Sequence, residues 1–221
     1  MSVDILILTY NRKKFERLIE TNINLQTYKK IRKVIICDDG NETLDLNIKY
    51  NIEYHKLKNR LTIAEKRNFL VKRVTSKYAA FMDDDDIYMP QYIYSSILRL
   101  NKEYFITGSP SMLIYNDKNI YIHRSSEPQL LNEATLVFEK QRIKSNSFRR
   151  IEGSPRGEGF VFLEGNVQNI SINPIQDIMI CISHSNNTVS KKYVLSKSLL
   201  IKDGETLISD EHKDILCSLL V

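Results

Sequence analysis

Residues 78–90, YAAFMDDDDIYMP, run from an apolar strand directly into four consecutive carboxylates, Asp83 to Asp86. Like charges at this spacing repel one another, and each ionised carboxylate loses hydration when it is even partly buried. A solvated acidic tail could carry these charges at little cost, but such tails do not follow a run like Tyr-Ala-Ala-Phe-Met. The segment therefore predicts a buried strand with a cationic group held against its carboxyl end.

The first half of the chain alternates apolar strands with amphipathic helices. Helical spacing of apolar residues begins at residue 13, at residue 62 and after residue 90. Thr62 and Glu65 predict a capping box, and Thr9 or Asn11 could cap the first helix. This alternation predicts a mostly parallel sheet flanked by helices. Strands are expected in VDILILTYNR (3–12), RKVIICDDG (32–40), YNIEYHKL (50–57) and KYAAFM (77–82).

The second half is less regular. A closing helix is expected over residues 205–220. Residues 139–157 carry six Lys and Arg among Gly, Ser and Pro, which predicts an exposed loop that could close over a bound diphosphate. Strands are expected in YFITGSPSMLIYN (104–116), NIYIHR (119–124), EATLVF (133–138) and QDIMICISH (176–184).

Composition bounds the class of protein. With 42% hydrophobic and 27% charged residues, the 221-residue chain is typical of a globular domain, and no apolar run approaches the roughly 20 residues of a membrane helix. The start lacks the layout of a secretory signal. Three widely spaced cysteines favour buried thiols in a reducing compartment, so we expect the cytoplasm. The net charge of +5 lies in residues 1–103, which hold 19 Lys and Arg against 14 Asp and Glu.

In parallel sheets, ligands bind beyond the carboxyl ends of the strands. Three predicted strands end there in polar residues, so their ends should meet in one crevice. A basic half around an acidic turn suits a phosphate ligand with a divalent metal, and a nucleic acid less well, because no aromatic-basic stacking motif is present. An acidic surface turn and an ordinary Asp-Gly turn are the plainer alternatives. The three ends are Thr9-Tyr10-Asn11, Asp38-Asp39-Gly40 and Asp83 to Asp86.

The sequence has no glycine loop of the kind that cradles phosphates. It contains seven glycines and no GxxxxGK pattern, which excludes a P-loop. GEGFVF at 157–162 begins like a dinucleotide fingerprint, but Phe162 stands at its third glycine position. A metal is therefore expected to neutralise a bound diphosphate.

The motifs ILILTYNR, VIICDDGNET, AEKRN and FMDDDDIYMP, in this order, resemble the nucleotide-binding half of GT-A-fold glycosyltransferases of family 2. NEATLVF, GEGFVFLEG and ISHSNNTVS resemble glycosyltransferases encoded by large DNA viruses, and the likeness covers residues 3–190. It implies an α/β, Rossmann-like GT-A fold with a mostly parallel sheet flanked by helices. It also implies a single domain, in which residues 1–103 bind the nucleotide-sugar and 104–221 form the acceptor and catalytic half. If viral, the protein would work in host cytoplasm.

The resemblance assigns roles to individual residues. The loop Thr9-Tyr10-Asn11 would line the nucleoside pocket, Asp39 would bind the base, and Arg67 would contact the base or the diphosphate. From the residues alone, an arginine such as Arg67 could reach a pyrophosphate or base but is more often a surface arginine, and only the resemblance gives His184 a role beyond a structural one.

Within the acidic turn, the resemblance places the metal on Asp85 and the ribose on Asp83 or Asp84, with a register that could shift by one residue. His184 would approach the metal or the diphosphate from the other side.

Family members of the inverting type commonly take the acceptor proton with a carboxylate of a Glu-Asp pair. This chain has Glu158-Gly159 instead, so Glu158 is the candidate base and Asp210-Glu211 the second choice. If Glu158 instead caps a helix, the base is unidentified or the activity weak.

The expected protein is thus a metal-dependent, inverting glycosyltransferase. It would use Mn²⁺ or Mg²⁺ and a UDP-sugar donor, and it would act on a hydroxyl of a glycan or protein acceptor, with no nucleic-acid partner and no membrane segment. The alternatives are a sugar nucleotidyltransferase, which usually carries a glycine-rich loop after the first strand, and a catalytically silent module that binds the nucleotide-sugar.

Overall fold

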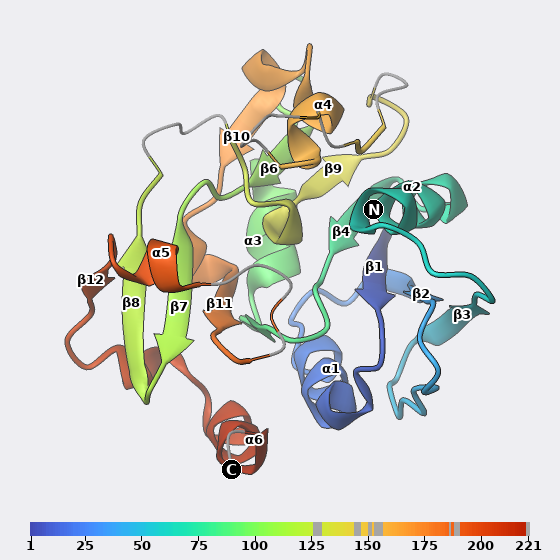
Figure 1. Cartoon of the computed structure of the whole chain (residues 1–221). Helices are drawn as coiled ribbons and strands as arrows, with labels where there is room; N and C mark the ends of the chain where they lie inside the picture. The colour runs from blue at the N-terminus through green and yellow to red at the C-terminus, as the bar shows by residue number, and fades with distance from the viewer. Residues whose placement is uncertain are drawn as a thin grey trace.

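The four strands of the first half lie side by side and form one side of a seven-stranded sheet, out to its edge (Figure 1). This computed structural model describes residues 1–125, 130–143, 147–149, 152, 157–185, 187 and 191–219. Neighbouring strands run parallel except at β9, which is antiparallel to both β4 and β6. The order is β10 (Ile170–Ile172), β6 (Ile106–Gly108), β9 (Val137–Glu139), β4 (Tyr78–Phe81), β1 (Val3–Thr9), β2 (Ile31–Asp38) and β3 (Asn51–Lys56).

A second, five-stranded sheet comes mostly from the second half of the chain. Its strands are antiparallel except for the pair β7 and β11. The two-residue strand that follows the acidic turn, β5, joins its edge, so the turn bridges the two sheets. The order is β12 (Leu199–Leu200), β8 (Asn119–His123), β7 (Met112–Asn116), β11 (Met179–Ile182) and β5 (Ile87–Tyr88).

Helices cover both faces of the large sheet because its central strands are apolar on both sides. On β1, Ile5 and Ile7 face a core that includes α1, α3 and α6, whereas Leu6 faces a second core that includes α2 and α4. The chain is therefore a mixed α/β domain with a central sheet flanked by helices, as expected. The helices are α1 (Glu16–Asn24), α2 (Ile63–Arg73), α3 (Tyr92–Arg99), α4 (Gly159–Leu163), α5 (Lys192–Leu195) and α6 (Asp210–Leu219).

Short 3-10 turns connect several of these elements. None of the described helices is both long and apolar enough to span a membrane. The turns are η1 (Lys13–Phe15), η2 (Glu133–Thr135), η3 (Val167–Asn169), η4 (Ile175–Asp177) and η5 (Gly204–Leu207).

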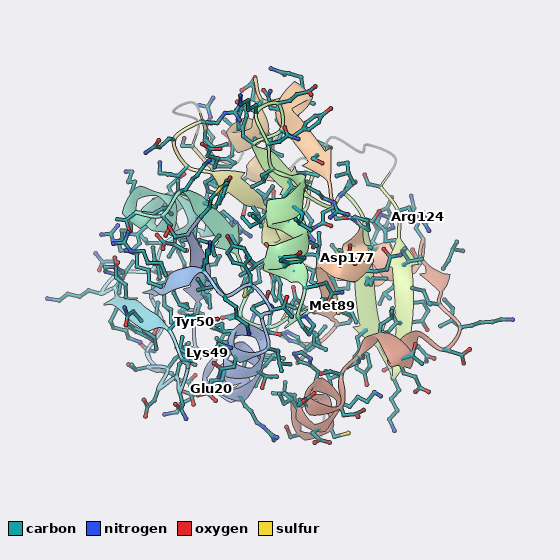
Figure 2. All side chains as sticks on the ribbon, turned by 180° about the vertical axis from the view of Figure 1, so that it is seen from behind. Glu20, Lys49, Tyr50, Met89, Arg124 and Asp177 are labelled. Carbon is teal, nitrogen blue, oxygen red and sulfur yellow. The ribbon has the colours of Figure 1, made fainter. Side chains whose placement is uncertain are left out.

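The loop between β2 and β3 is tied to α1 at the edge of the sheet. Glu20 Oε1 accepts from the backbone N–H of Asn47 at 2.5 Å, and Asn24 donates to Asn47 O and accepts from Lys49 N at 3.2 Å each. Glu20 and Lys49 are labelled in Figure 2. These contacts satisfy backbone groups of a loop that has no regular structure of its own.

Capping was predicted correctly for one helix and wrongly for another. Thr62 and Glu65 form the expected capping box at α2, since each side chain bonds the other residue's backbone N–H. By contrast, no side chain in the described part of the chain caps η1 or α1. Asn11 instead has a φ of 51°, and its Oδ1 accepts from Asn41 N at 2.6 Å.

Two other predictions are wrong in part. The expected strand 133–138 is half 3-10 turn, because the Asn132 side chain caps η2 and β9 starts only at Val137. Of the three cysteines expected to be buried, Cys217 is exposed on α6.

The predicted exposed loop over residues 139–157 is anchored at Phe148. The Phe148 ring is 1% exposed and stacks on Phe162, with 4.1 Å between ring centroids. The Asn68 side chain bonds both the N–H and the C=O of Phe148 at 2.8 Å. Residues 144–146, 150, 151 and 153–156 of this loop lie outside the described residues, and so does the predicted closure over a diphosphate.

Candidate active site

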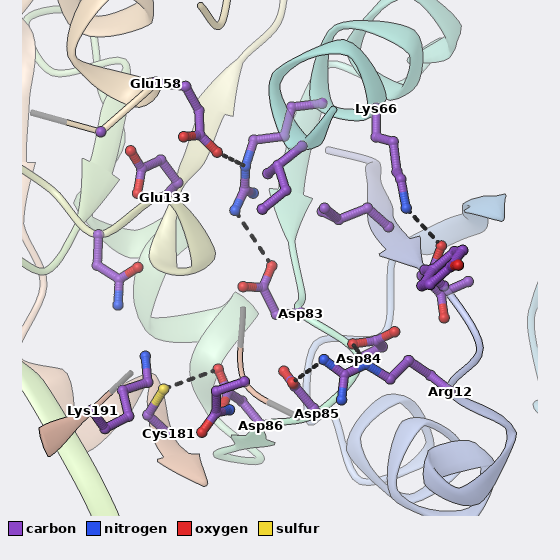
Figure 3. A pocket seen from close by; sticks show the side chains of 18 of the residues that line it. Arg12, Lys66, Asp83, Asp84, Asp85, Asp86, Glu133, Glu158, Cys181 and Lys191 are labelled. Carbon is purple, nitrogen blue, oxygen red and sulfur yellow. Dashed lines mark hydrogen bonds and ion pairs between the residues drawn. The ribbon is translucent and has the colours of Figure 1, made fainter. Parts of the chain in front are cut away.

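A cleft of about 680 Å³ opens beyond the carboxyl ends of β1 and β4 and is bounded on the other side by the second sheet. Figure 3 shows the carboxylates of the acidic turn along its floor. The loop Thr9-Tyr10-Asn11 lines it, as expected. Its charged lining residues are Arg12, Arg60, Lys66, Arg67, Asp83, Asp84, Asp85, Asp86, Glu133, Glu158 and Lys191.

The first three carboxylates of the turn each lie against a cation supplied by the chain itself. Asp83 Oδ1 is 3.6 Å from Arg67 Nη2, and Asp84 Oδ1 is 3.9 Å from Arg12 Nε. Asp85 Oδ2 is 3.1 Å from Arg12 Nη2. The cationic group that the sequence predicted at this turn is therefore present within the fold.

Two contacts link the acidic turn to the second sheet, one through His184 and one through Asp86. His184 follows β11, and its Nε2 lies 3.0 Å from Asp85 Oδ2. The Asp86 carboxylate accepts from the backbone N–H of Ile182 at 3.0 Å and from the Cys181 thiol at 3.4 Å. Asp86 thus fixes the turn to β11.

The four carboxylates differ in how easily they ionise. Burial raises the pKa of Asp83, Asp84 and Asp86, and the charge of Asp85 adds to this effect at each of them. Burial acts in the same direction on Asp85, but the hydrogen bond from His184 and the charge of Arg12 outweigh it and lower the pKa of Asp85. Asp85 is therefore held as the carboxylate ion.

Lys191 brings a cation to the opposite wall of the cleft. Burial opposes its charge, but the neighbouring Cys181, Asp86 and Asp83 outweigh burial and raise the pKa of Lys191. Lys191 therefore stays charged beside the acidic turn.

Asp39 lies behind the cleft wall rather than on it. Its side chain is fully buried and bonds Arg60 Nη1 and Leu61 N at 2.7 Å each, and Lys66 pairs with the same carboxylate. The Arg60 guanidinium covers the ring of Tyr10, 3.3 Å from its centroid. The side chains that face the cleft here are therefore Arg60 and Lys66, whereas Asp39 positions them.

Arg67 lies between the two halves of the chain. It extends from α2 over the ring of Phe81, between Asp83 and Glu158, and its Nε is 3.9 Å from Glu158 Oε1. Its Nε and Nη1 atoms are buried and donate no hydrogen bond to any described residue. Two strong donors thus remain for a bound anion.

Glu158 stands at the N-cap position of α4, but its side chain makes no cap hydrogen bond. Glu133 does this instead, since its Oε1 accepts from Gly159 N at 2.9 Å. The second candidate, the pair Asp210-Glu211, is exposed at the start of α6, where Asp210 pairs with Lys213, and neither residue lines the cleft. The structure therefore brings Glu158, and not Asp210, to the acidic turn.

A model of glycosyl transferase family 2 matches residues 4–156, more than half of the chain. The chain belongs to glycosyl transferase family 2. A curated relative, an uncharacterized glycosyltransferase of Rickettsia conorii, is 29% identical over 129 residues, which are 54% of this chain and 20% of that protein.

Solved structures of glycosyltransferases share the fold of this family 2 chain. S. aureus TarS 1-349 in complex with UDP-GlcNAc matches with a TM-score of 0.62 and 16% identity over 100% of this chain and 72% of that one. The mannosyltransferase PcManGT of Pyrobaculum calidifontis, in complex with GDP-Man and Mn²⁺, matches with a TM-score of 0.61 and 10% identity over 84% of this chain and 58% of that one. The comparisons give no indication of a viral origin, so that likeness stays a prediction.

Five charged residues of this family 2 cleft were missed by the sequence reasoning. Arg12 and Lys66 lie next to residues that were singled out, in TYNR and AEKRN, but an isolated basic residue gave no separate signal. Glu133 lies in NEATLVF but was given no role there, and no motif marks Arg60 or Lys191. The five are Arg12, Arg60, Lys66, Glu133 and Lys191.

The donor set of the family 2 site fits a hard divalent cation. The carboxylates of Asp84 and Asp85 would supply the oxygen ligands that such an ion prefers, and His184 Nε2 lies beside them, 3.0 Å from Asp85 Oδ2. No described residue donates a hydrogen bond to the buried Oδ2 of Asp84. The described residues form no cluster of three or more such ligands, so water and phosphate oxygens would complete the coordination.

Proposed function

We propose that this domain is a metal-dependent, inverting glycosyltransferase. It moves a sugar from a nucleotide-diphosphate donor, UDP-linked, to a hydroxyl of a glycan or protein acceptor. The observation that carries the proposal is the cleft itself, in which four carboxylates and the cations Arg12, Arg67 and Lys191 meet beyond the strand ends. Such a site holds a diphosphate and a metal together.

The donor would lie along the floor of the cleft. Thr9, Tyr10 and Asn11 line the part proposed for the nucleoside, and Asp83 or Asp84 would accept from the ribose hydroxyls. Asp39 would act on the base through Arg60 and Lys66, which it holds in place. A UDP donor is favoured because TarS is seen with UDP-GlcNAc, whereas GDP remains open because PcManGT is seen with GDP-Man.

Charge develops on the leaving diphosphate as the bond from the anomeric carbon to the phosphate oxygen breaks. Asp85 and His184 would hold the metal, which when bound supplies positive charge to that diphosphate. Arg67 would donate to the same oxygens through Nε and Nη1, which donate no hydrogen bond to any described residue.

Glu158 is the proposed base. It would accept the proton of the acceptor hydroxyl while the hydroxyl oxygen attacks the anomeric carbon from the face opposite the diphosphate, which inverts the configuration. Glu158 lines the cleft, and its Oε1 lies 3.9 Å from Arg67 Nε.

A donor panel tests the proposal. UDP-, GDP- and dTDP-sugars are compared by thermal shift with and without Mn²⁺, because a ligand that binds the folded state raises the apparent stability. We expect one nucleotide class to stabilise the protein in a Mn²⁺-dependent way and to release its diphosphate slowly. Asp85→Asn should abolish the Mn²⁺-dependent shift. Pyrophosphate release from a nucleoside triphosphate would indicate a nucleotidyltransferase, and binding without any release would indicate a silent module.

The chain spans about a fifth of the Rickettsia relative, so the activity of a longer protein, its acceptor and its partners are part of this proposal. The cytoplasm stays our proposed compartment, in keeping with three free cysteines.

A further inference from the structure

We infer that Arg12 is an internal counter-cation of the acidic turn, and that its guanidinium and a divalent metal ion bind the pair Asp84 and Asp85 in alternation. Metal binding would then require Arg12 to leave the turn. This inference rests on the proposed metal-dependent function and adds a residue that sets the metal affinity of the site.

Arg12 is built into the site rather than lying loosely over it. The side chains of Arg12, Asp84 and Asp85 are 12%, 8% and 14% exposed. The guanidinium also lies 5.4 Å from the ring centroid of Phe15, and the Phe15 ring in turn packs against His184 at 5.2 Å. Figure 3 shows the Arg12 side chain reaching along the floor of the cleft to the two carboxylates.

Arg12 contacts the same oxygen of Asp85 that is proposed to bind the metal. Asp85 Oδ2 contacts both Arg12 Nη2 at 3.1 Å and His184 Nε2 at 3.0 Å. A divalent ion shared by Asp85 and His184 would lie close to the guanidinium. Two cations at such a distance repel strongly in a site with little water. The two therefore exclude one another from this carboxylate.

Charge balance points the same way. The Arg12 guanidinium is a full positive charge held 3.1 Å from the Asp85 carboxylate and 3.9 Å from that of Asp84. The carboxylate therefore already has a cationic partner, and an incoming metal must replace it. Without Arg12, the carboxylate would lack this partner and should attract a metal ion more strongly.

The test is a Mn²⁺ titration without nucleotide, read by calorimetry and by the electron paramagnetic resonance signal of free Mn²⁺. We expect Arg12→Gln to lower the Kd for Mn²⁺ at least about fivefold relative to the wild type, by removal of a competing charge. Arg12→Lys keeps a positive charge at this position and should stay nearer the wild-type Kd. Arg12→Met, which also removes the charge, should lower the Kd in the same way as Arg12→Gln and serves if the Gln variant does not fold.

The matched control is Arg60→Gln. Arg60 lines the same cleft and carries the same charge, but it contacts Asp39 and Tyr10 instead of the acidic turn. Its Kd should change by less than about twofold, because the turn keeps its own counter-cation.

Several results would overturn the inference. An unchanged or weaker Mn²⁺ affinity in Arg12→Gln would show that Arg12 does not compete with the metal. An equal gain in Mn²⁺ affinity in Arg60→Gln would show that the effect comes from the net charge of the protein and not from the contact of Arg12 with the turn. If no variant binds Mn²⁺, even with UDP present, the inference fails together with metal dependence. Release of UDP from a UDP-sugar in the presence of EDTA then decides separately whether glycosyl transfer survives.

Discussion

Glu158, the proposed base, lies next to Arg67 in the cleft. Glu158→Gln keeps the shape of the side chain but cannot accept the acceptor proton. We expect the Kd for the donor to change little and the transfer rate to fall at least about 100-fold, which is typical for loss of a general base. Donor binding by calorimetry and transfer by product release measure the two separately.

Glu133 provides the comparison for that prediction. It also lines the cleft, but its Oε1 is engaged by Gly159 N. If Glu158→Gln transfers sugar normally while Glu133→Gln does not, the proton goes to Glu133 and our assignment is wrong.

At the level of single residues, the sequence identified the acidic side chains better than their partners. Asp83 to Asp86, Arg67 and Glu158 were singled out because they follow strands or lie in recognisable motifs, and all of them line one cleft. The cations that neutralise the carboxylates could not be assigned, since an arginine in TYNR has no sequence feature that aims it at a turn some 70 residues away. Asp39 was singled out from the sequence but does not line the cleft. Its burial behind Arg60 and Lys66 depends on packing, which the local sequence does not reveal.

At the scale of elements, α2 joins the nucleotide half to the segment after β9. Asn68 bonds both backbone groups of Phe148, which places the ring of Phe148 against Phe81 and within 5.9 Å of the Arg67 guanidinium. We predict that Asn68→Ala lowers the free energy of unfolding by about 1–3 kcal/mol, because it leaves two largely buried backbone groups without partners. Urea denaturation measures this loss.

Asn24 is a matched control for that substitution. It also bonds a neighbouring loop in both directions, to Asn47 and Lys49, but at 3.2 Å and in a place open to solvent. Water can replace its hydrogen bonds, so Asn24→Ala should lower the free energy of unfolding by less than Asn68→Ala does. Equal losses in the two variants would contradict a special role for the contact with Phe148.

Helices and strands with a clear periodicity of apolar residues were predictable from the sequence, and elements that depend on distant partners were not. The strands of the first half, the capping box of α2 and the helix after residue 90 all follow from local patterns. The antiparallel insertion of β9 between β4 and β6 could not be read from its three residues, because strand order depends on the whole sheet. Phe148 was misjudged because a single aromatic residue in a basic run gives no periodic signal.

At the scale of the whole molecule, α6 is fastened to the region of the acidic turn through one asparagine. Asn22 on α1 donates to the backbone C=O of Asp86 at 2.8 Å, and its Oδ1 accepts from Tyr88 N and from His212 Nε2 on α6. Since Nε2 is the donor, the neutral His212 ring accepts at Nδ1, where the hydroxyl of Ser209 lies at 2.9 Å.

Burial lowers the pKa of His212 to about 4, from an ordinary value near 6.5. In the unfolded chain His212 therefore takes up a proton below about pH 6.5, whereas in the folded chain it does so only near pH 4. Stability is fully present above pH 6.5 and should fall by at most about 3 kcal/mol as the pH drops through this window. Denaturation midpoints between pH 7 and pH 4.5 measure the loss.

His212→Gln should flatten this pH dependence, since glutamine does not titrate. His55→Gln, at a more exposed histidine on the edge strand β3, should leave the loss in place. An unchanged slope in His212→Gln would show that other groups cause the acid sensitivity.

The larger of the two apolar cores contains residues from both sheets and from both parts of the chain, including Ile36 on β2, Tyr92 on α3, Ile114 on β7 and Ile180 on β11. Residues 1–103 and 104–221 thus share one interior. Severed near residue 104, either fragment would expose the apolar face that the other covers, and we expect such fragments to aggregate unless they are produced together. Neither part has the whole of this core to itself, so exchanging one of them for that of a relative would require redesigning the apolar contacts between them.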